Sequence, residues 1–142
     1  MFNSYLQQIF SKAKTGEASE RTYYPVLEEL LKKYREDSEI IIEPKRSSVG
    51  IPDFKVETGK GSLLGYIEAK DLGRDLDRLS KLEQDQIDKY KKEYPKLIVT
   101  NFIEFRLFEN GGLVDSVVIA QPVTLEIGIL VLDNEGRVRG IF

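Results

Sequence analysis

The sequence contains no cysteine, no histidine and no tryptophan among its 142 residues. The lack of cysteine excludes disulfides, thiol nucleophiles and every zinc site with a cysteine ligand. The lack of histidine excludes an imidazole base, a serine triad of the usual kind and a histidine-ligated transition metal. Any metal that this chain binds must therefore be held by oxygen atoms, which favours Mg²⁺ or Mn²⁺ over zinc.

Long apolar runs are also missing, since none approaches the roughly 18 residues that span a membrane. Residues 1–14 are amphipathic and lack the apolar centre and cleavage site of a signal peptide. With 41% hydrophobic and 32% charged residues the composition is that of a soluble globular protein. We therefore expect a cytoplasmic protein that forms one domain over residues 1–142 and does not enter the membrane.

The net charge of −3 argues against nucleic-acid binding through bulk electrostatics alone, although it leaves room for a local basic surface. Lysine and arginine do fall in short clusters along the chain. On a helix face such clusters more often serve solvation than binding. The charge therefore favours no partner by itself.

Hydrophobic periodicity and turn residues predict the order of the elements. We expect helices over residues 2–14 and from Ser19 to about residue 34, and a linker followed by a helix over residues 72–94, ended by Pro95. Strands are expected at residues 40–42, 54–56, 63–67, 96–100, 104–108 and 113–119. A tail at residues 121–142, with a turn at 133–136, completes the chain. This order predicts a mixed central sheet flanked by helices, an α+β arrangement.

The triplet Glu68-Ala69-Lys70 ends the strand at residues 63–67, which is mainly apolar and therefore expected to be buried. Strand alternation puts Glu68 and Lys70 on the same face. Buried charges cost free energy unless they are paired or bound to a metal. The triplet alone is a weak motif, because Glu43-Pro44-Lys45 is a second E-x-K. An ion pair at a sheet end is the alternative interpretation.

What distinguishes this triplet is Asp53, which stands where the preceding strand of the hairpin begins. Pairing of the two strands would bring Asp53 and Glu68 together, and the carbonyl of Ala69 would complete an all-oxygen Mg²⁺ site. Lys70 could then orient a water or stabilise negative charge on a phosphate. These residue types predict a phosphodiester hydrolase.

Two further polar residues lie where helices should be apolar. Glu20 falls within the stripe of Tyr24, Leu27 and Leu31, so it is a candidate third carboxylate. Gln86 lies at the edge of the inner face predicted for the third helix, which includes Leu76, Leu79, Ile87 and Tyr90. For both, a boundary residue or a helix-terminal acid favoured by the dipole is an equal alternative.

Together these segments resemble the PD-(D/E)xK nuclease superfamily, in particular the N-terminal nuclease domain of single-chain enzymes that fuse a restriction nuclease to an adenine methyltransferase. The resemblance covers about residues 19–108. It is carried by Glu20-Arg21-Thr22-Tyr23-Tyr24-Pro25, Gly50-Ile51-Pro52-Asp53-Phe54, Gly65-Tyr66-Ile67-Glu68-Ala69-Lys70, Gln86 with Tyr90, and Leu97-Ile98-Val99-Thr100-Asn101-Phe102 before Glu104-Phe105-Arg106.

The resemblance implies a restriction-endonuclease-like core, a mixed four-stranded sheet flanked by helices, within about residues 19–120. It implies that Asp53 and Glu68 bind the metal, that Lys70 assists catalysis, and that Glu20 and Gln86 are the acid and glutamine of the flanking helices. Thr100 and Asn101 are expected near the substrate backbone, with a structural turn as the alternative.

The expected function is hydrolysis of double-stranded DNA by a Mg²⁺-dependent endonuclease of a restriction-modification system. A Holliday-junction resolvase is a second possibility, disfavoured by the acidic balance, and an inactive binding or assembly module of the same fold is a third. No methyltransferase motif occurs here. We therefore expect a fragment or truncated homologue, whose full-length chain carries methyltransferase and target-recognition regions and which dimerises transiently on DNA.

Overall fold

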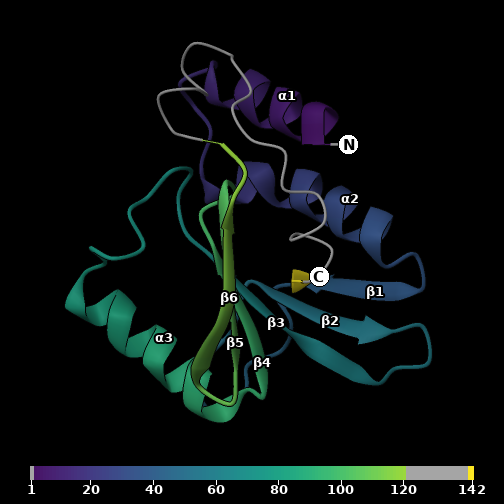
Figure 1. Cartoon of the computed structure of the whole chain (residues 1–142), viewed down its shortest axis with the longest axis vertical. Coiled ribbons are helices and arrows are strands. Elements are labelled where there is room, and N and C mark those ends of the chain that lie inside the picture. The colour runs from purple at the N-terminus through teal and green to yellow at the C-terminus, as the bar shows by residue number, and fades with distance from the viewer. Residues whose placement is uncertain (1, 121–140) are drawn as a thin grey trace.

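The computed structural model describes residues 2–120 and 141–142, whose elements alternate in the order that the sequence predicts (Figure 1). The described residues form α1 (Phe2–Ala13), the 3₁₀ turn η1 (Glu20–Tyr23), α2 (Tyr24–Tyr34), β1 (Ser38–Ile42), β2 (Phe54–Thr58), β3 (Leu63–Ala69), α3 (Lys81–Glu93), β4 (Lys96–Thr100), β5 (Glu104–Glu109) and β6 (Gly112–Val118). The predicted turn at residues 133–136 lies outside the described residues.

The strands form one mixed sheet in the order β1-β2-β3-β4-β5-β6. Neighbouring strands are antiparallel except for β3 and β4, which are parallel and are joined through α3. A parallel connection requires a crossover of about a dozen residues or more, which α3 provides. The predicted mixed sheet flanked by helices is confirmed, with six strands where the resemblance implied a core of four.

Helices cover the two faces of the sheet separately (Figure 1). Strand β4 shows the division, because Ile98 packs in the cluster under α1 and α2 whereas Leu97 and Val99 pack in the cluster under α3. This is the alternation of a strand whose two faces are both covered. The centre of the sheet is therefore buried from both sides.

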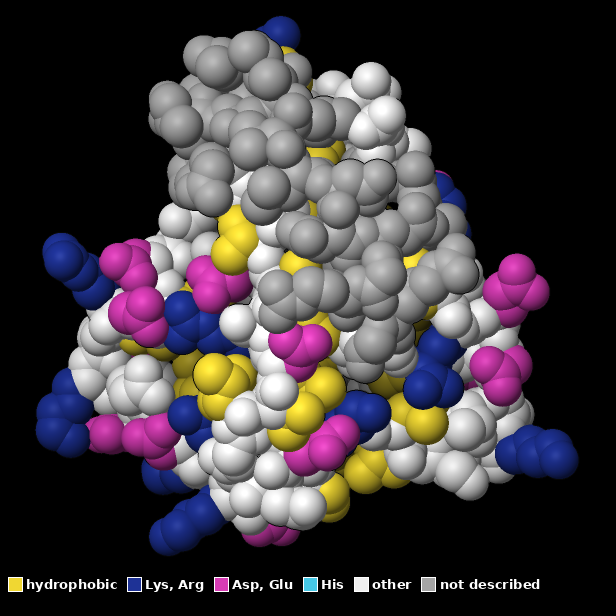
Figure 2. Space-filling model, viewed as in Figure 1, with side chains coloured by type: hydrophobic (Ala, Val, Ile, Leu, Met, Phe, Trp, Pro, Cys, Tyr) yellow, Lys and Arg dark blue, Asp and Glu magenta, His cyan; other side chains and the backbone are white. Residues whose placement is uncertain are grey.

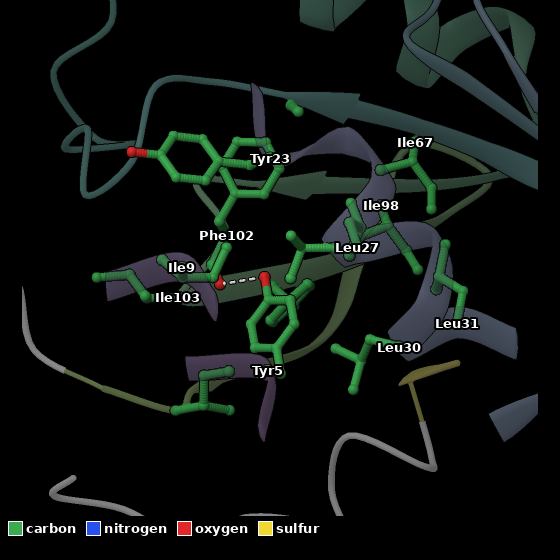
Figure 3. Close-up of a cluster of buried hydrophobic side chains, with 14 of the residues drawn as sticks. Tyr5, Ile9, Tyr23, Leu27, Leu30, Leu31, Ile67, Ile98, Phe102 and Ile103 are labelled. Atoms are coloured by element: carbon green, nitrogen blue, oxygen red, sulfur yellow. Dashed lines mark hydrogen bonds between the residues drawn. The ribbon is translucent and has the colours of Figure 1, made fainter. Parts of the chain in front are cut away.

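The larger cluster is built on side chains from α1 and α2, several of which appear in Figure 3. Leu27 and Ile9 are fully buried there, and each such aliphatic side chain contributes about 1.5–3 kcal/mol to stability. The buried Tyr5 hydroxyl donates a hydrogen bond of 2.6 Å to the carbonyl of Phe102, the contact dashed in Figure 3. Helix α1 is thus part of the core.

Two helix starts differ from the prediction. The second helical segment begins with the 3₁₀ turn η1, and α2 starts only at Tyr24. Helix α3 begins at Lys81, where Ser80 caps it by accepting the backbone N–H of Glu83. Leu76 and Leu79 therefore precede α3, although both pack in the cluster beneath it. The spacing of these two leucines resembles that of a helix, but it arises because both side chains pack inward from the loop before α3.

Strand β3 is not buried along its whole length, which corrects the expectation for residues 63–67. Leu63, beside the hairpin turn, is 46% exposed, whereas Ile67 is 2% exposed and Glu68 8% exposed. The helices cover the second half of the strand only. The buried half is the one that carries Glu68.

Near the other end of the chain, Phe142 lies against the core. Its ring meets Phe105 edge-on at 5.2 Å between centroids, and its carbonyl accepts a hydrogen bond of 2.6 Å from the Arg35 side chain.

None of the helices in the described ranges, 2–120 and 141–142, has the length and the apolar character of a membrane span.

Candidate active site

Asp53 and Glu68 meet where β2 begins and β3 ends. The antiparallel register pairs Phe54 with Ile67, which sets Asp53 opposite Glu68. The backbone N–H of Asp53 donates to Glu68 Oε1 at 3.3 Å. The predicted meeting of the two acids at this end of the hairpin is confirmed.

Two fixed donors orient the Asp53 carboxylate. Its Oδ2 accepts the backbone N–H of Ala69 at 2.7 Å, and its Oδ1 accepts the hydroxyl of Tyr24, also at 2.7 Å. The Tyr24 ring is buried against Phe54, with ring centroids 4.7 Å apart. Because both donors belong to packed elements, the plane of the carboxylate is set by the fold.

Glu20, in η1, reaches the same place through Tyr24. Its Oε1 lies 3.2 Å from the Tyr24 hydroxyl, one helical turn away, so the two acids share that hydroxyl. Burial, and then the charge of Asp53, raise the pKa of Glu20 to about 7. Glu20 is thus part of the acidic site, linked to Asp53 through a tyrosine.

Glu68 is the most deeply buried acid of the site. Burial, followed by the nearby Asp53 carboxylate, raises the pKa of Glu68 well above its ordinary value. Lys70 offsets part of this effect, since its Nζ lies 3.7 Å from Glu68 Oε2. The expected placement of Glu68 and Lys70 on one face is confirmed.

Lys70 also faces a second acid, Glu83 in the first turn of α3. The distance from its Nζ to Glu83 Oε2 is 3.7 Å, and Arg74 binds both oxygens of Glu83 at 2.7 and 3.2 Å. The hydrogen bond from the Ser80 backbone, and then that from Arg74, lower the pKa of Glu83 to about 2. The ammonium of Lys70 is therefore held between two carboxylates.

Gln86, from the middle of α3, holds the turn that leads to Asp53. Its side-chain amide donates to the carbonyl of Val49 at 2.7 Å. The next residue, Gly50, has a φ of 136°, and a Cβ there would lie 2.9 Å from Gln86 Nε2. In this geometry Gln86 acts on the loop before Asp53, so it positions the acid.

Thr100 and Asn101 are buried and their side chains bind the backbone of their own turn. The Thr100 hydroxyl donates to the carbonyl of Glu104 at 2.7 Å, and Asn101 Oδ1 accepts the N–H of the same residue at 2.7 Å. The Asn101 amide also donates to the carbonyl of Arg74 at 2.8 Å. These contacts favour the structural-turn alternative, and substrate binding by the pair stays a prediction.

The donor chemistry of the site fits a hard divalent cation in part. The two acids Asp53 and Glu68 face each other, and the charge of Asp53 adds to burial in raising the pKa of Glu68; a divalent cation prefers such oxygen ligands and would offset their repulsion. Among the described residues, however, no group of three or more Asp, Glu, His or Cys side chains is arranged to hold a metal ion. Asp53 and Glu68 thus fit a divalent cation as a pair of ligands, and Glu20 is separated from Asp53 by the Tyr24 hydroxyl.

Sequence reasoning missed the residues that connect these acids. Tyr24 was placed in an apolar stripe, yet buried tyrosines usually seek a partner for the hydroxyl, and its spacing of four from Glu20 was a usable signal. Nothing local marked Glu83 as a partner of Lys70. Asp71 also lines the hollow that contains Glu20 and Asp53.

No protein-family model and no curated protein matches the sequence. The fold is similar to part of a chain in the cryo-EM structure of a DrdV–DNA complex, with a TM-score of 0.64 and 21% sequence identity. The similarity covers 81% of this chain and 12% of that chain. At this identity the comparison shows a shared fold, and this chain spans a small part of the larger protein.

Proposed function

We propose that this protein is a Mg²⁺-dependent endonuclease that hydrolyses phosphodiester bonds of double-stranded DNA. The observation that carries the proposal is the meeting of Asp53, Glu68 and Lys70 at one end of the β2–β3 hairpin. The fold shared with part of a DrdV–DNA complex supports DNA as the substrate. The resemblance to PD-(D/E)xK nucleases, which includes these three residues among the segments of residues 19–108, supports hydrolysis as the reaction.

In this proposal Asp53 and Glu68 would hold the cation, with the Ala69 carbonyl and Glu20 as further oxygen ligands and Mn²⁺ as a substitute for Mg²⁺. When bound, the cation neutralises phosphate charge and lowers the pKa of a water. Tyr24 and the Ala69 N–H fix the Asp53 carboxylate, and burial keeps competing water from Glu68.

Lys70 supplies a positive charge at the site. Its ammonium lies between Glu68 and Glu83 and has three hydrogen-bond donors. From there it can donate to a phosphate oxygen, or to a water that attacks phosphorus, as negative charge develops. Glu83 keeps the ammonium close to the hairpin end.

We propose further that the chain is the cleavage domain of a restriction-modification enzyme, with methyltransferase and target-recognition regions in the same full-length protein. The similarity covers only 12% of the DrdV chain, which supports the proposal that this chain is one part of a larger enzyme. One site cuts one strand, so a double-strand break would need two copies that meet on DNA.

Nicking of a supercoiled plasmid in Mg²⁺ tests the proposal. Asp53→Asn keeps an acceptor for the Ala69 N–H and removes the charge, so we expect nicking to fall at least about 100-fold, consistent with loss of a charge-stabilising group. Asp37→Asn, an exposed acid before β1, is the matched control and should nick as the parent does. Equal nicking by Asp53→Asn and the parent would contradict the proposal.

The alternative, an inactive module of the same fold that binds or assembles, has a specific observation in its favour, the lack of a three-acid cluster among the described residues. Calorimetric titration with Mn²⁺ separates the two. A nuclease should lose Mn²⁺ affinity in Glu68→Ala, whereas an inactive module should bind Mn²⁺ no better than that variant does.

A further inference from the structure

Most of the charged residues that line the hollow beside Asp53 are acids. Among the described residues that line it are Glu20, Glu43, Asp53 and Asp71, and Arg21 is the one cation in that lining. On the described part of the face in Figure 2, Lys and Arg side chains are interspersed with Asp and Glu, in keeping with the net charge of −3. A polyanion that approaches this hollow therefore needs a specific cationic contact.

Arg21 is available for such a contact. Its guanidinium is paired with Glu43 at 2.9 and 3.1 Å, which bridges η1 to the segment after β1. The two side chains are 73% and 38% exposed. Exposed pairs of this kind contribute only about 0–1 kcal/mol, so a competing anion can displace Glu43 at little cost.

The chemistry of the pair selects a phosphate as that anion. A guanidinium presents a planar fork of donors that can match two phosphate oxygens, and in the pair with Glu43 only one of its nitrogens, Nη2, lies against the two carboxylate oxygens. Arg21 directly follows Glu20, which is linked to Asp53 through Tyr24. A phosphate held by Arg21 would therefore belong to a polyanion strand that runs into the candidate active site.

We propose that Arg21 is a phosphate-binding residue of the substrate site, which exchanges Glu43 for a backbone phosphate of the DNA strand when substrate binds. Glu43 acts as a stand-in for the phosphate and as a competitor of it. The inference rests on the proposed function, because it takes the polyanion to be DNA. The inference predicts opposite changes in DNA affinity for substitutions of Arg21 and of Glu43.

The test measures affinity for a fluorescent DNA duplex by anisotropy, with Mg²⁺, at several salt concentrations. All variants carry Lys70→Ala so that the duplex stays intact. Arg21→Ala should weaken binding about 10-fold at low salt and reduce the slope of log affinity against log salt by about 1. Arg21→Lys should restore the slope but only part of the affinity, because an ammonium lacks the fork.

Glu43→Gln should have the opposite effect and strengthen binding about 3-fold, by release of Arg21 and removal of a like charge. In the Arg21→Ala background that gain should shrink. The matched control is the exposed pair Lys33–Glu29 on α2, at 3.9 Å. Lys33 lies about 14 Å along the helix from Tyr24, so Lys33→Ala and Glu29→Gln should leave the salt slope unchanged.

The inference is overturned if Arg21→Ala keeps the parent's salt slope, or if Glu43→Gln strengthens binding equally with and without Arg21. Those results leave plasmid nicking by the parent and its loss in Asp53→Asn untouched, so the proposed function would stand. Absence of any duplex binding overturns the inference, and plasmid nicking by the unsubstituted chain shows independently whether the nuclease proposal has failed as well.

Discussion

At the residue scale, the geometry of the candidate site depends on how the Asp53 carboxylate is oriented. Its two carboxylate oxygens accept one bond each from Tyr24 and from the Ala69 backbone. The first donor comes from a helix and the second from a strand, so the carboxylate is oriented before any ligand arrives. Pre-orientation of this kind improves metal affinity, because little freedom is left to lose on binding.

We predict that Tyr24→Phe keeps the fold and weakens the site. The ring still packs against Phe54, while the bonds to Asp53 and Glu20 are lost. Loss of such a supporting bond typically lowers metal affinity or activity about 10- to 100-fold. The measurement is the Mg²⁺ concentration that half-saturates nicking, which should rise.

Tyr5→Phe is the matched control for this change. It removes a buried hydroxyl bond, that to the Phe102 carbonyl, which does not involve the acids of the site. The control should lose stability but keep its Mg²⁺ dependence. If both variants show the same Mg²⁺ dependence as the parent, Tyr24 has no positioning role.

The pH dependence of stability follows from Glu68, whose pKa is raised from 4.5 to about 9. A raised pKa means that the folded state favours the protonated form. That contribution is fully present below pH 4.5 and is lost as the pH rises toward 9. The protein in metal-free buffer should therefore lose stability between about pH 5 and pH 9.

Glu68→Gln removes the buried charge and should abolish that loss. At pH 8 in metal-free buffer we expect its Tm to exceed the parent's by roughly 3–6 °C, about 1 kcal/mol, and the difference to vanish near pH 5. Lys70 keeps Glu83 as a partner in this variant. A lower Tm for the variant at both pH values would contradict the sign, and Mg²⁺ should stabilise the parent only.

The sequence predicted which residues lie at the site better than it predicted what each residue does there. Strand alternation and pairing placed Glu68, Lys70 and Asp53 correctly, because these rules depend on the backbone alone. The spacing of Tyr24 from Glu20 pointed to their contact, but its bond to Asp53 could not be predicted, since it depends on how α2 packs over the start of β2. Thr100 and Asn101 were polar in a turn, and sequence alone does not say whether a turn binds its own backbone or a substrate.

At the element scale, the site depends on the contact between α3 and the turn before β2. Gln86 binds the Val49 carbonyl, and the hydroxyls of Ser47 and Tyr94 lie 2.7 Å apart. These bonds fix the turn against the helix, and the turn leads through Ile51-Pro52 to Asp53. Displacement of α3 would therefore move an acid that lies on another element.

Gly50→Ala should break this contact. Its φ of 136° disfavours any side chain, and the new Cβ would lie 2.9 Å from Gln86 and 3.0 Å from the Tyr90 hydroxyl. We expect a loss of about 2–3 kcal/mol in the free energy of unfolding, measured by urea denaturation.

Gly16→Ala provides the comparison for Gly50→Ala. Its φ is 72°, also in the region that favours glycine, but a Cβ there meets nothing within 4 Å. This control should lose only about 1 kcal/mol. Equal losses in the two variants would show that the contact with α3 contributes nothing beyond backbone strain.

Most elements could be predicted because their signals are local. Runs of β-branched residues and glycine turns marked the strands, and the predicted limits agree with the structure to within a few residues. The start of α3 was misplaced because Leu76 and Leu79 repeat at a helical spacing while packing from a loop. The capping box formed by Ser80 and Glu83, three residues apart, is the sequence signal that marks the true start.

At the scale of the whole molecule, the site lies where both helical layers reach the same end of the sheet. Glu20 and Tyr24 come from the α1–α2 side, Glu83 and Gln86 from α3, and the remaining groups from the hairpin between them. The layering followed from the order of the elements. The inclusion of α1 in the core did not, because the resemblance covers a stretch that begins after it.

The central claim is that Lys70 performs chemistry at a site that Asp53 and Glu68 prepare. The most direct test is the plasmid nicking rate of Lys70→Ala at saturating Mg²⁺, beside Lys45→Ala, the lysine of the second E-x-K. We predict that Lys70→Ala nicks at least about 100-fold more slowly than the parent, as for loss of a charge-stabilising group, while Lys45→Ala retains most of the activity. Nicking by Lys70→Ala at the parent's rate would contradict the account.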